Sequence, residues 1–342
     1  MATPTERHLL SVAGRDVVVT NPLKVLFPAA GHTKLDVAQY YVTVAEGALR
    51  AAGGRPNMLV RFPNGIGASH FYQKRVPTNR PDWIDVATIQ FPSGRTAEEI
   101  VPRDAASLVW MANLGCLELH PHPVRAGDLD HPDELRIDLD PVPGVRFSQV
   151  RDVAAVVHAV LEEFALVGWP KTSGSRGIHV NVRIQPRWSF TDVRRAALAL
   201  AREVERRIPE LATTAWWKEE RRGVFLDYNQ NAKDRTVAAA YSIRPKPHAP
   251  VSAPLSWTEV ADAEPEDFTV KTMMQRFTKI GDRHREIDAH PGSLESLLDL
   301  SERQALAGQG EAPWPPHYSK QKGEPARVMP SRRRRVPART AS

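Results

Sequence analysis

The sequence predicts an α+β fold of α/β character, in which mixed central β-sheets are flanked by helices. Strand-like segments alternate with two long segments of helical periodicity, the pattern of a mixed sheet covered by helices. The 29 prolines are spread along the chain, which indicates many loops between short elements. The 342 residues are enough for one large core or two smaller domains.

The first third of the chain is expected to mix helices and strands. Thr33 followed by Asp36 resembles a capping box, so a helix is predicted from there to about Ala52. Two strands, over residues 57–62 and 71–76, are predicted next and are joined by a turn-rich loop. One largely buried helix is predicted over residues 104–118. The single cysteine, Cys116, is predicted to be a core residue of this helix.

The rest of the chain alternates strands with the two long helices. An apolar stripe over residues 148–168, closed by Gly168, predicts one amphipathic helix, and residues 191–208 predict the other. Strands are expected at four places: 134–140, 177–184, 223–228 and 235–243. After about residue 306, glycine, proline and charge dominate. The predicted organisation is therefore a catalytic domain over residues 1–306 and a disordered basic tail over residues 307–342.

Composition excludes several classes of protein. No run of about 18 apolar residues is present, so no membrane span and no membrane partner are predicted. The N-terminus lacks a basic start followed by an apolar stretch, which argues against a secretory signal. One cysteine permits neither a disulfide framework nor a zinc site with two thiolates. A cytoplasmic location is expected.

The net charge of +6 is concentrated at one end of the chain. Residues 320–342 contain eight Lys or Arg and one Glu, a charge of +7, which leaves −1 for residues 1–319. A nucleic-acid surface on the body of the protein must therefore be a local patch, or be helped by the tail.

Three aspartates are the first candidate site. Asp138 and Asp140 lie at the end of a predicted strand, where residues i and i+2 point to one face about 6–7 Å apart. Asp227 ends another apolar strand. Carboxylates at the ends of adjacent strands suit Mg²⁺ or Mn²⁺ and two-metal phosphoryl transfer. On the tripeptide alone, two solvated acids at a strand end are an equally good interpretation.

A loop over residues 171–179 is the second candidate. Its glycines let backbone N–H groups converge on an anion, and its serines and Arg176 add hydroxyl donors and a planar fork for phosphate oxygens. No GxxxxGK[ST] loop occurs in the sequence. Taken alone, the segment also fits an ordinary Ser/Gly hairpin turn.

Together these segments resemble the three motifs of the archaeo-eukaryotic primase superfamily: the DxD pair at Asp138 and Asp140, the SGSRGIH loop, and the late acid Asp227. Within that superfamily, the chain more closely resembles the polymerase domain of bacterial ATP-dependent ligase D, the end-joining repair enzyme. The resemblance runs over about residues 20–300 and is carried by several blocks in the same order: TNPLKVLFPAAGHTK, FYQK, LVWMANLGCLELHPHPVRAGDLDHPDELRIDLDP, KTSGSRGIHV and LDYNQNAKDRTVAAAYSIR. It implies a primase-type catalytic core.

The resemblance also implies roles for individual residues. Asp138, Asp140 and Asp227 fall on the catalytic and metal-binding positions. The nucleotide-binding positions fall on His120, Ser173, Ser175, Arg176, His179, Arg221, Gln230 and Arg244. Members of the family often have lysine where Arg176 stands, so a cation is kept but its contact with phosphate becomes forked. The loop around Arg221 differs in length from the family pattern.

On the DNA side, the resemblance assigns the 5′-phosphate of a downstream strand to Asn21, Lys24 and Lys34, and template stacking to Phe71 and Tyr72. Without the resemblance the two lysines would be taken for solvated surface residues. One of the two aromatic residues is expected to face inward, because neighbours on a strand alternate.

The function implied is a stand-alone, template-dependent primase-polymerase, a nucleotidyltransferase that fills short gaps or extends broken ends bearing a 5′-phosphate. Ribonucleotides are expected to be favoured over deoxyribonucleotides, with two Mn²⁺ or Mg²⁺ ions and NTP or dNTP as substrate. No ligase motif of the ExKxDG type is present. A separate DNA ligase and a Ku-type protein are expected partners, and a nucleoid-associated place in the cytoplasm is expected.

Three other interpretations remain open from the sequence. A primase that starts strands de novo would need a second nucleotide site, which is not visible. A non-catalytic module that binds 5′-phosphorylated DNA ends would not need Asp138, Asp140 and Asp227. A Mn²⁺-dependent glycosyltransferase also uses DxD, but would need neither Asp227 nor the SGSRGIH loop.

Overall fold

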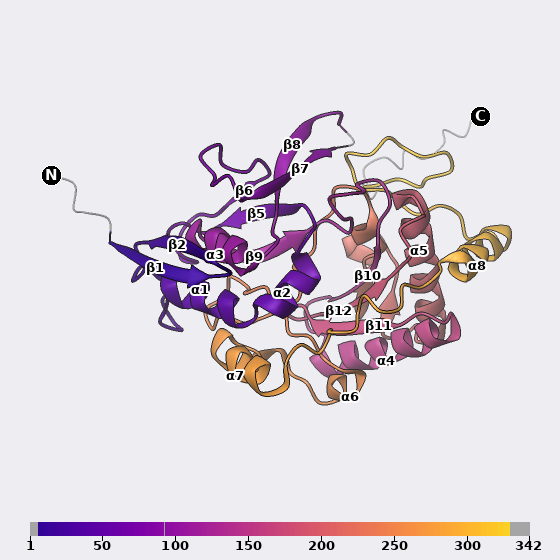
Figure 1. Cartoon of the computed structure of the whole chain (residues 1–342). Helices are drawn as coiled ribbons and strands as arrows, with labels where there is room; N and C mark the ends of the chain where they lie inside the picture. The colour runs from indigo at the N-terminus through magenta and orange to yellow at the C-terminus, as the bar shows by residue number, and fades with distance from the viewer. Residues whose placement is uncertain (1–5, 92, 329–342) are drawn as a thin grey trace, which may run out of the picture.

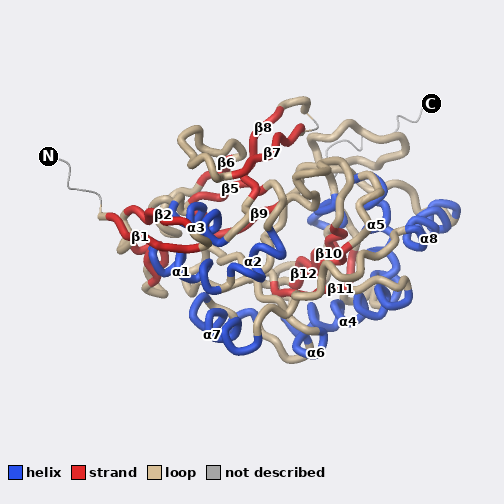
Figure 2. Tube along the Cα trace, viewed as in Figure 1, coloured by secondary structure: helices blue, strands red, loops and turns tan. Residues whose placement is uncertain are grey.

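The structure is a computed structural model that describes residues 6–91 and 93–328 (Figure 1). Within these residues, two five-stranded sheets form the centre of the fold, with helices around them (Figure 2). The predicted α+β fold with mixed sheets and flanking helices is confirmed. No helix in the described part of the chain combines the length and the apolar character needed to cross a membrane.

The sheet that carries the three aspartates has the order β11-β12-β10-β14-β13. Its strands are β10 (Glu134–Pro141), β11 (Gly168–Thr172), β12 (Ile178–Arg183), β13 (Ala212–Thr213) and β14 (Val224–Leu226). β10 is central and antiparallel to both β12 and β14, whereas β13 runs parallel to β14, so the sheet is mixed. The predicted strands at 134–140, 177–184 and 223–228 are thereby confirmed to within a few residues.

The second sheet has β5 at its centre. Its strands are β5 (Asn57–Arg61), β6 (Phe71–Gln73), β7 (Asp85–Gln90), β8 (Thr96–Val101) and β9 (Cys116–Pro121). Two hairpins precede it: β1 (Arg7–Val12) with β2 (Arg15–Thr20), and β3 (Val25–Phe27) with β4 (His32–Thr33). The sequence predicted neither hairpin, and it missed β7 and β8.

Helices pack on both sheets (Figure 1). They are α1 (Lys34–Thr43), α2 (Ala45–Ala52), α3 (Ala105–Asn113), α4 (Phe147–Glu163), α5 (Phe190–Arg207), α6 (Trp257–Val260), α7 (Val270–Ile280) and α8 (Glu295–Leu306). Thr33 caps α1, and Asp36 completes the predicted capping box, although the helix breaks at Val44 into α1 and α2. The two long helices predicted at 148–168 and 191–208 are α4 and α5. Both pack against β10 and against each other, and their small and branched side chains form much of the core.

The predicted helix over residues 104–118 is half wrong. α3 ends at Asn113, and the chain continues as β9, which pairs with β5. Gly115 makes the change possible, because its φ of +81° is a conformation that L side chains rarely adopt. Short apolar runs do not distinguish a buried helix from a buried strand. Cys116 is buried as predicted, but on a strand.

The predicted strand over residues 235–243 is absent, and the strand predicted over 71–76 stops at Gln73. Residues 235–243 form an irregular buried segment in which Tyr241 has a φ of +67°. Ala239 N–H donates to Leu119 O and Tyr241 N–H donates to Ser252 O, so these backbone groups are satisfied outside any ladder. Burial alone explains the apolar run.

Part of the predicted tail is ordered. Residues 311–327 pack against the domain, with Trp314 5% and Glu324 6% exposed, so the prediction of a disordered stretch is wrong there. Residues 307–342 contain few aliphatic side chains, so their composition did not indicate that hydrogen bonds anchor part of this segment to the domain. The arginine run at 332–335 lies outside the described residues, and the division of the chain at residue 306 stays a prediction.

Candidate active site

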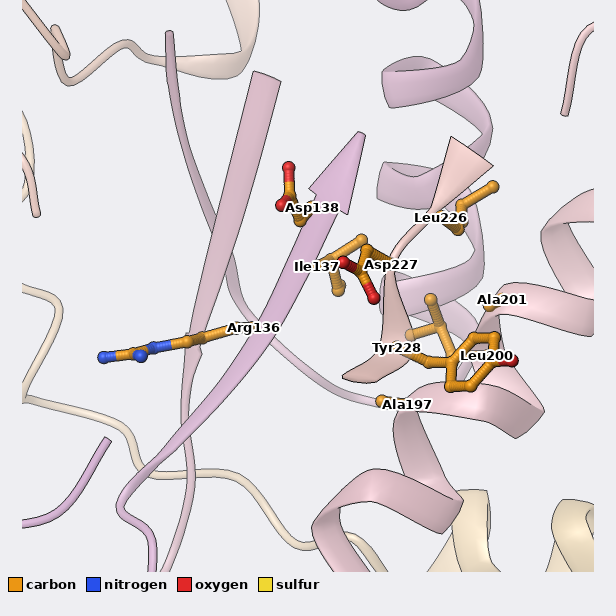
Figure 3. Close-up of a pocket in the computed structure, with 9 residues that line it drawn as sticks. All are labelled: Arg136, Ile137, Asp138, Ala197, Leu200, Ala201, Leu226, Asp227 and Tyr228. Carbon is orange, nitrogen blue, oxygen red and sulfur yellow. The ribbon is translucent and has the colours of Figure 1, made fainter. Parts of the chain in front are cut away.

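The three predicted acids lie side by side on β10 and β14. Asp138 and Asp140 share one face of β10, with buried Leu139 between them on the other. β14 pairs with β10, and the N–H of Asp227, just after β14, donates to the carbonyl of Asp138 at 3.0 Å. Figure 3 shows Asp138 and Asp227 on these neighbouring strands, in a pocket that α5 also lines. The predicted carboxylate group is thus assembled by the register of the sheet.

Asp227 is held by the short turn that follows it. One carboxylate oxygen, Oδ1, accepts the N–H of Asn229, and the other, Oδ2, accepts Nε2 of Gln230, both at 3.0 Å. This turn is η2 (Tyr228–Asn231), which Asp227 caps. Gln230, predicted to contact nucleotide, therefore also touches a predicted metal ligand.

The acids perturb one another. Burial and then the charge of Asp138 raise the pKa of Asp227 to about 6. The same two causes, in the same order, raise the pKa of Asp140. Burial opposes the ionisation of Asp138 as well, but His179, Lys171 and Arg244 outweigh it, so the pKa of Asp138 falls. A divalent cation would relieve exactly this kind of repulsion between carboxylates.

His179 connects the phosphate loop to the acids. It lies opposite Asp138 on β12, and its Nε2 is 3.3 Å from Asp138 Oδ1. Burial and then Lys171 lower the pKa of His179 to about 4, so the ring is neutral at neutral pH. The contact with Asp138 is therefore one between a carboxylate and a neutral imidazole rather than an ion pair.

Lys171 lies behind His179 and is 1% exposed. Its Nζ is 2.7 Å from Nδ1 of His179 and donates to Ala238 O and Ser252 Oγ, each at 2.8 Å. Burial lowers the pKa of Lys171 to about 7. A donor at Nδ1 assigns the ring proton of His179 to Nε2, facing Asp138. The sequence placed Lys171 in the loop segment without giving it a role.

The predicted phosphate loop is closed by its own first serine. Ser173 Oγ accepts the N–H groups of Ser175 at 3.1 Å and Gly177 at 3.0 Å. Ser175 Oγ accepts Lys246 Nζ at 2.5 Å, which brings a cation that the sequence did not predict. Arg176 is exposed, and its charge acts on Asp140. The loop therefore brings the charge of Arg176 to Asp140 and holds the ammonium of Lys246 at Ser175.

Gly174 is required by this packing. Its φ is +68°, and a Cβ there would lie 2.5 Å from Arg244 Cγ. Arg244 in turn forms an ion pair with Glu118 on β9, with Nε 2.9 Å from Oε1. Glu118 was not predicted.

His120, on β9 beside Glu118, has both ring nitrogens buried without a hydrogen-bond partner in the described residues. Its Nε2 is 3.4 Å from Glu118 Oε2, outside hydrogen-bond geometry. A buried polar group without a partner marks a place where a ligand group would be stabilised. This fits the predicted role of His120 in binding nucleotide.

Arg221 lies close enough to Asp140 and Asp227 for its charge to act on both carboxylates. Its guanidinium stacks 3.5 Å above the Phe225 ring and donates to the carbonyls of Ala215 and Trp216. Its charge opposes the pKa rise of Asp140 and Asp227, so the structure brings it to the site despite the altered loop length.

The residues predicted for DNA gather near β5. Lys24 donates to Asn64 Oδ1 at 2.7 Å, and Lys34, 7% exposed, donates to Asn113 O at 3.1 Å. Burial, and then the charges of Lys24 and Arg61, lower the pKa of Lys34. A buried lysine facing two further cations is poised for an anion. Arg61 is a member of this cluster that the sequence did not predict.

Asn21 precedes the cluster with a φ of +49°, and its carbonyl accepts the N–H of Lys24 at 3.0 Å. Phe71 and Tyr72 are 44% and 64% exposed, so the expectation that one faces inward is wrong. β6 is a three-residue edge strand, which has little core to cover. Arg61 lies 5.2 Å from the centre of the Phe71 ring.

The donor set fits Mg²⁺ or Mn²⁺, because Asp138, Asp140 and Asp227 supply carboxylate oxygens only. In their present positions no three His, Cys, Asp or Glu side chains of residues 6–91 and 93–328 are gathered closely enough to enclose an ion. The contact of Asp138 with His179 and the hydrogen bond from Gln230 to Asp227 hold these carboxylates as they are.

Residues 33–284 match the family model of the LigD primase-polymerase domain. The chain belongs to this family. It is 35% identical over 284 residues to the multifunctional non-homologous end joining protein LigD of Mycolicibacterium smegmatis, covering 82% of this chain and 37% of that protein. It is 31% identical over 261 residues to the bifunctional non-homologous end joining protein LigD of Bacillus subtilis, covering 75% and 42%.

Among solved structures, the polymerase domain of Mycobacterium tuberculosis ligase D in complex with DNA is similar to this LigD primase-polymerase family member, with a TM-score of 0.74 and 34% identity. The similarity covers 80% of this chain and 99% of that one. The chain spans only about two fifths of the length of the curated relatives, 37% and 42% in the two cases above.

Proposed function

We propose that this chain is a template-dependent primase-polymerase that fills short gaps or extends broken DNA ends, by two-metal nucleotidyl transfer and with a preference for ribonucleotides. The observation that carries the proposal is the joint placement of Asp138 and Asp140 on the central strand β10 and of Asp227 just after its neighbour β14, with the loop of Ser173 and Arg176 close by. Membership of the LigD primase-polymerase family supports it.

The acids would hold two Mn²⁺ or Mg²⁺ ions, which lower the pKa of the primer 3′-hydroxyl and neutralise the triphosphate when bound. Arg176 and Lys246 would meet the phosphate oxygens; the proposal is supported by the charge of Arg176 near Asp140 and by the hydrogen bond from Lys246 to Ser175 in the same loop. His179, with its proton on Nε2, orients Asp138 and can donate to a phosphate oxygen.

The rest of the nucleotide would meet His120, Arg221, Gln230 and Arg244. The ring nitrogens of His120 have no hydrogen-bond partner among residues 6–91 and 93–328, and Arg221 adds positive charge near Asp140. Arg244 is fixed by Glu118, so its geometry is set before a nucleotide arrives.

The DNA would be gripped at the second sheet. Lys24, Lys34 and Arg61 form a cationic cluster suited to a terminal 5′-phosphate, and exposed Phe71 and Tyr72 offer faces for base stacking. A separate DNA ligase and a Ku-type protein are proposed partners, and a nucleoid-associated place in the cytoplasm is the proposed location.

The test is extension of a labelled primer across a short gap that bears a 5′-phosphate, with Mn²⁺ and either ribonucleotides or deoxyribonucleotides. Asp138→Ala is the control. Metal-dependent addition that is lost in Asp138→Ala, and faster with ribonucleotides, is the expected result. Tight binding to the gap without addition would favour an end-binding module. Synthesis of a dinucleotide without primer would favour a primase.

A further inference from the structure

Residues 311–327, here called the C-terminal strap, lie outside the 33–284 stretch that matches the family model. Figure 1 shows this segment in yellow beside α5, after α8. The strap contacts the turn that starts at Asp227 and the loop that carries Arg221. No role for it follows from the family match.

The first anchor of the strap is Arg194 on α5, which is fully buried. Its guanidinium donates to the carbonyls of Ala312 at 2.9 Å and Pro313 at 3.0 Å, and pairs with Glu311 at 2.7 Å. The ring of Trp314 covers it at 4.0 Å. A buried arginine needs such partners, so the strap and α5 are tied together.

The second anchor is Asn229, which is 2% exposed. Its Nδ2 donates to Pro313 O at 3.0 Å, and its Oδ1 accepts Nε of Arg194 at 2.7 Å. Its backbone N–H donates to Asp227 Oδ1. Asn229 thus contacts both the strap, at Pro313, and the carboxylate of Asp227, a predicted metal ligand.

Further contacts fix the same two loops. Tyr318 Oη donates to Lys233 O, and His317 lies 3.1 Å from Asp234, a few residues beyond Asp227. On the other loop, the indole N–H groups of Trp216 and Trp217 donate to the carbonyls of Arg327 and Ala326 at 3.0 Å. The carbonyl of Trp216 accepts Arg221.

We propose that the C-terminal strap is a positioning element that sets the affinity of the site for its divalent ions by holding Asp227 and Arg221 in place. β14 has only three residues, and the segments on both sides of it are irregular, so the sheet alone leaves them weakly restrained. Partners that orient metal ligands typically change metal affinity or activity about 10–100-fold. The inference rests on the proposed metal site.

The test compares two truncations of the chain. Ending the chain after residue 310 removes the strap, whereas ending it after residue 328 removes only the stretch beyond it and is the matched control. Binding of Mn²⁺ alone is measured by the loss of the free-ion electron paramagnetic resonance signal, and circular dichroism checks the fold. We expect about 10–100-fold weaker Mn²⁺ binding for the shorter chain and no change for the control.

Equal Mn²⁺ binding by the full chain and a folded chain ending at residue 310 would overturn the proposal. If that truncation fails to fold, Trp314→Ala decides, because it weakens the strap without shortening the chain. Unchanged Mn²⁺ affinity in Trp314→Ala would then refute it. Extension assays add a second readout: a strap that positions Asp227 lowers kcat more than it raises KM for primer.

The Mn²⁺ readout separates this inference from the proposed function. If Mn²⁺ binding by the full chain depends on the strap but the chain extends no primer, the polymerase assignment is wrong and the positioning role of the strap stands. If the full chain extends primers but removal of the strap leaves Mn²⁺ binding unchanged, the polymerase assignment stands and the positioning role of the strap is wrong.

Discussion

Replacing Asp227 by asparagine is expected to stabilise the protein while abolishing its activity. Burial and the neighbouring Asp138 raise the pKa of Asp227 from 3.8 to about 6. The folded state therefore binds a proton more tightly than the unfolded state does, and folding loses stability as the pH rises from about 4 to about 6. At pH 7 the full penalty is present. An amide carries no charge, so the substitution removes it.

The size of the effect follows from the shift. A rise from 3.8 to about 6 corresponds to about 3 kcal/mol. The side chain is partly exposed, so solvent screening reduces the gain to about 1–3 kcal/mol. The new amide oxygen can still accept the N–H of Asn229, and a flipped Gln230 can accept the new N–H₂, so both hydrogen bonds survive. For a chain of 342 residues, the melting temperature would rise by about 1–4 °C.

The assay is thermal melting of Asp227→Asn and the unmodified chain from pH 4 to 8, without metal and with Mn²⁺. Without metal, the difference should be small near pH 4 and constant above pH 6. With Mn²⁺ at about 1,000 times its dissociation constant the order should reverse, because the ion then adds about 4.1 kcal/mol to a chain that binds it, more than the substitution gains without metal. Asp152→Asn, at an exposed aspartate of α4, is the matched control and should not change the melting temperature.

A lower melting temperature for Asp227→Asn at pH 7 without metal would refute the reasoning. It would mean that the carboxylate is stabilising as a charge, for instance through Arg221, and that repulsion from Asp138 is not the dominant effect. Equal stabilisation of both chains by Mn²⁺ would remove Asp227 from the metal site.

Three further outcomes are expected. Asp140→Ala should abolish primer extension and leave DNA binding, measured by fluorescence anisotropy, within about twofold, since a surface carboxylate contributes little to affinity; retained extension would remove the metal assignment. Lys24→Ala with Lys34→Ala should erase any preference for a 5′-phosphate over a 5′-hydroxyl gap; a surviving preference would place that pocket elsewhere. Lys171→Met should lower kcat about 10–100-fold at an unchanged DNA affinity, because His179 loses the donor that keeps its proton on Nε2; an unchanged kcat would make Lys171 a packing residue only.

The central elements of the site were predictable because their signals are local. Asp138 and Asp140 share a face through the two-residue period of a strand, and Asp227 ends an apolar strand in the same way. The loop from Ser173 to His179 is a continuous segment, so its chemistry is visible without knowing the fold.

The residues that were missed are tied to the site by long-range contacts. Glu118 pairs with Arg244 across more than a hundred positions, and Arg61 joins Lys34 only because both donate to carbonyls at the end of α3, those of Leu114 and Asn113. The strap was predicted to be part of a disordered tail because the composition of residues 307–342 does not show that Arg194, on α5, binds this segment. Periodicity and composition describe neighbours in sequence, and these contacts depend on neighbours in space.

The strand wrongly predicted over residues 235–243 has a physical connection to the site. The carbonyl of Ala238 accepts Lys171 Nζ, and that of Ser242 accepts the N–H of Ser252, whose hydroxyl is another acceptor for Lys171. In a sheet, the carbonyl of Ala238 would be occupied by a neighbouring strand. The irregular backbone, with Tyr241 at positive φ, frees it for the lysine that orients His179. The periodicity rule for strands fails where the backbone itself supports His179, a predicted nucleotide-binding residue, as expected when function competes with regular structure.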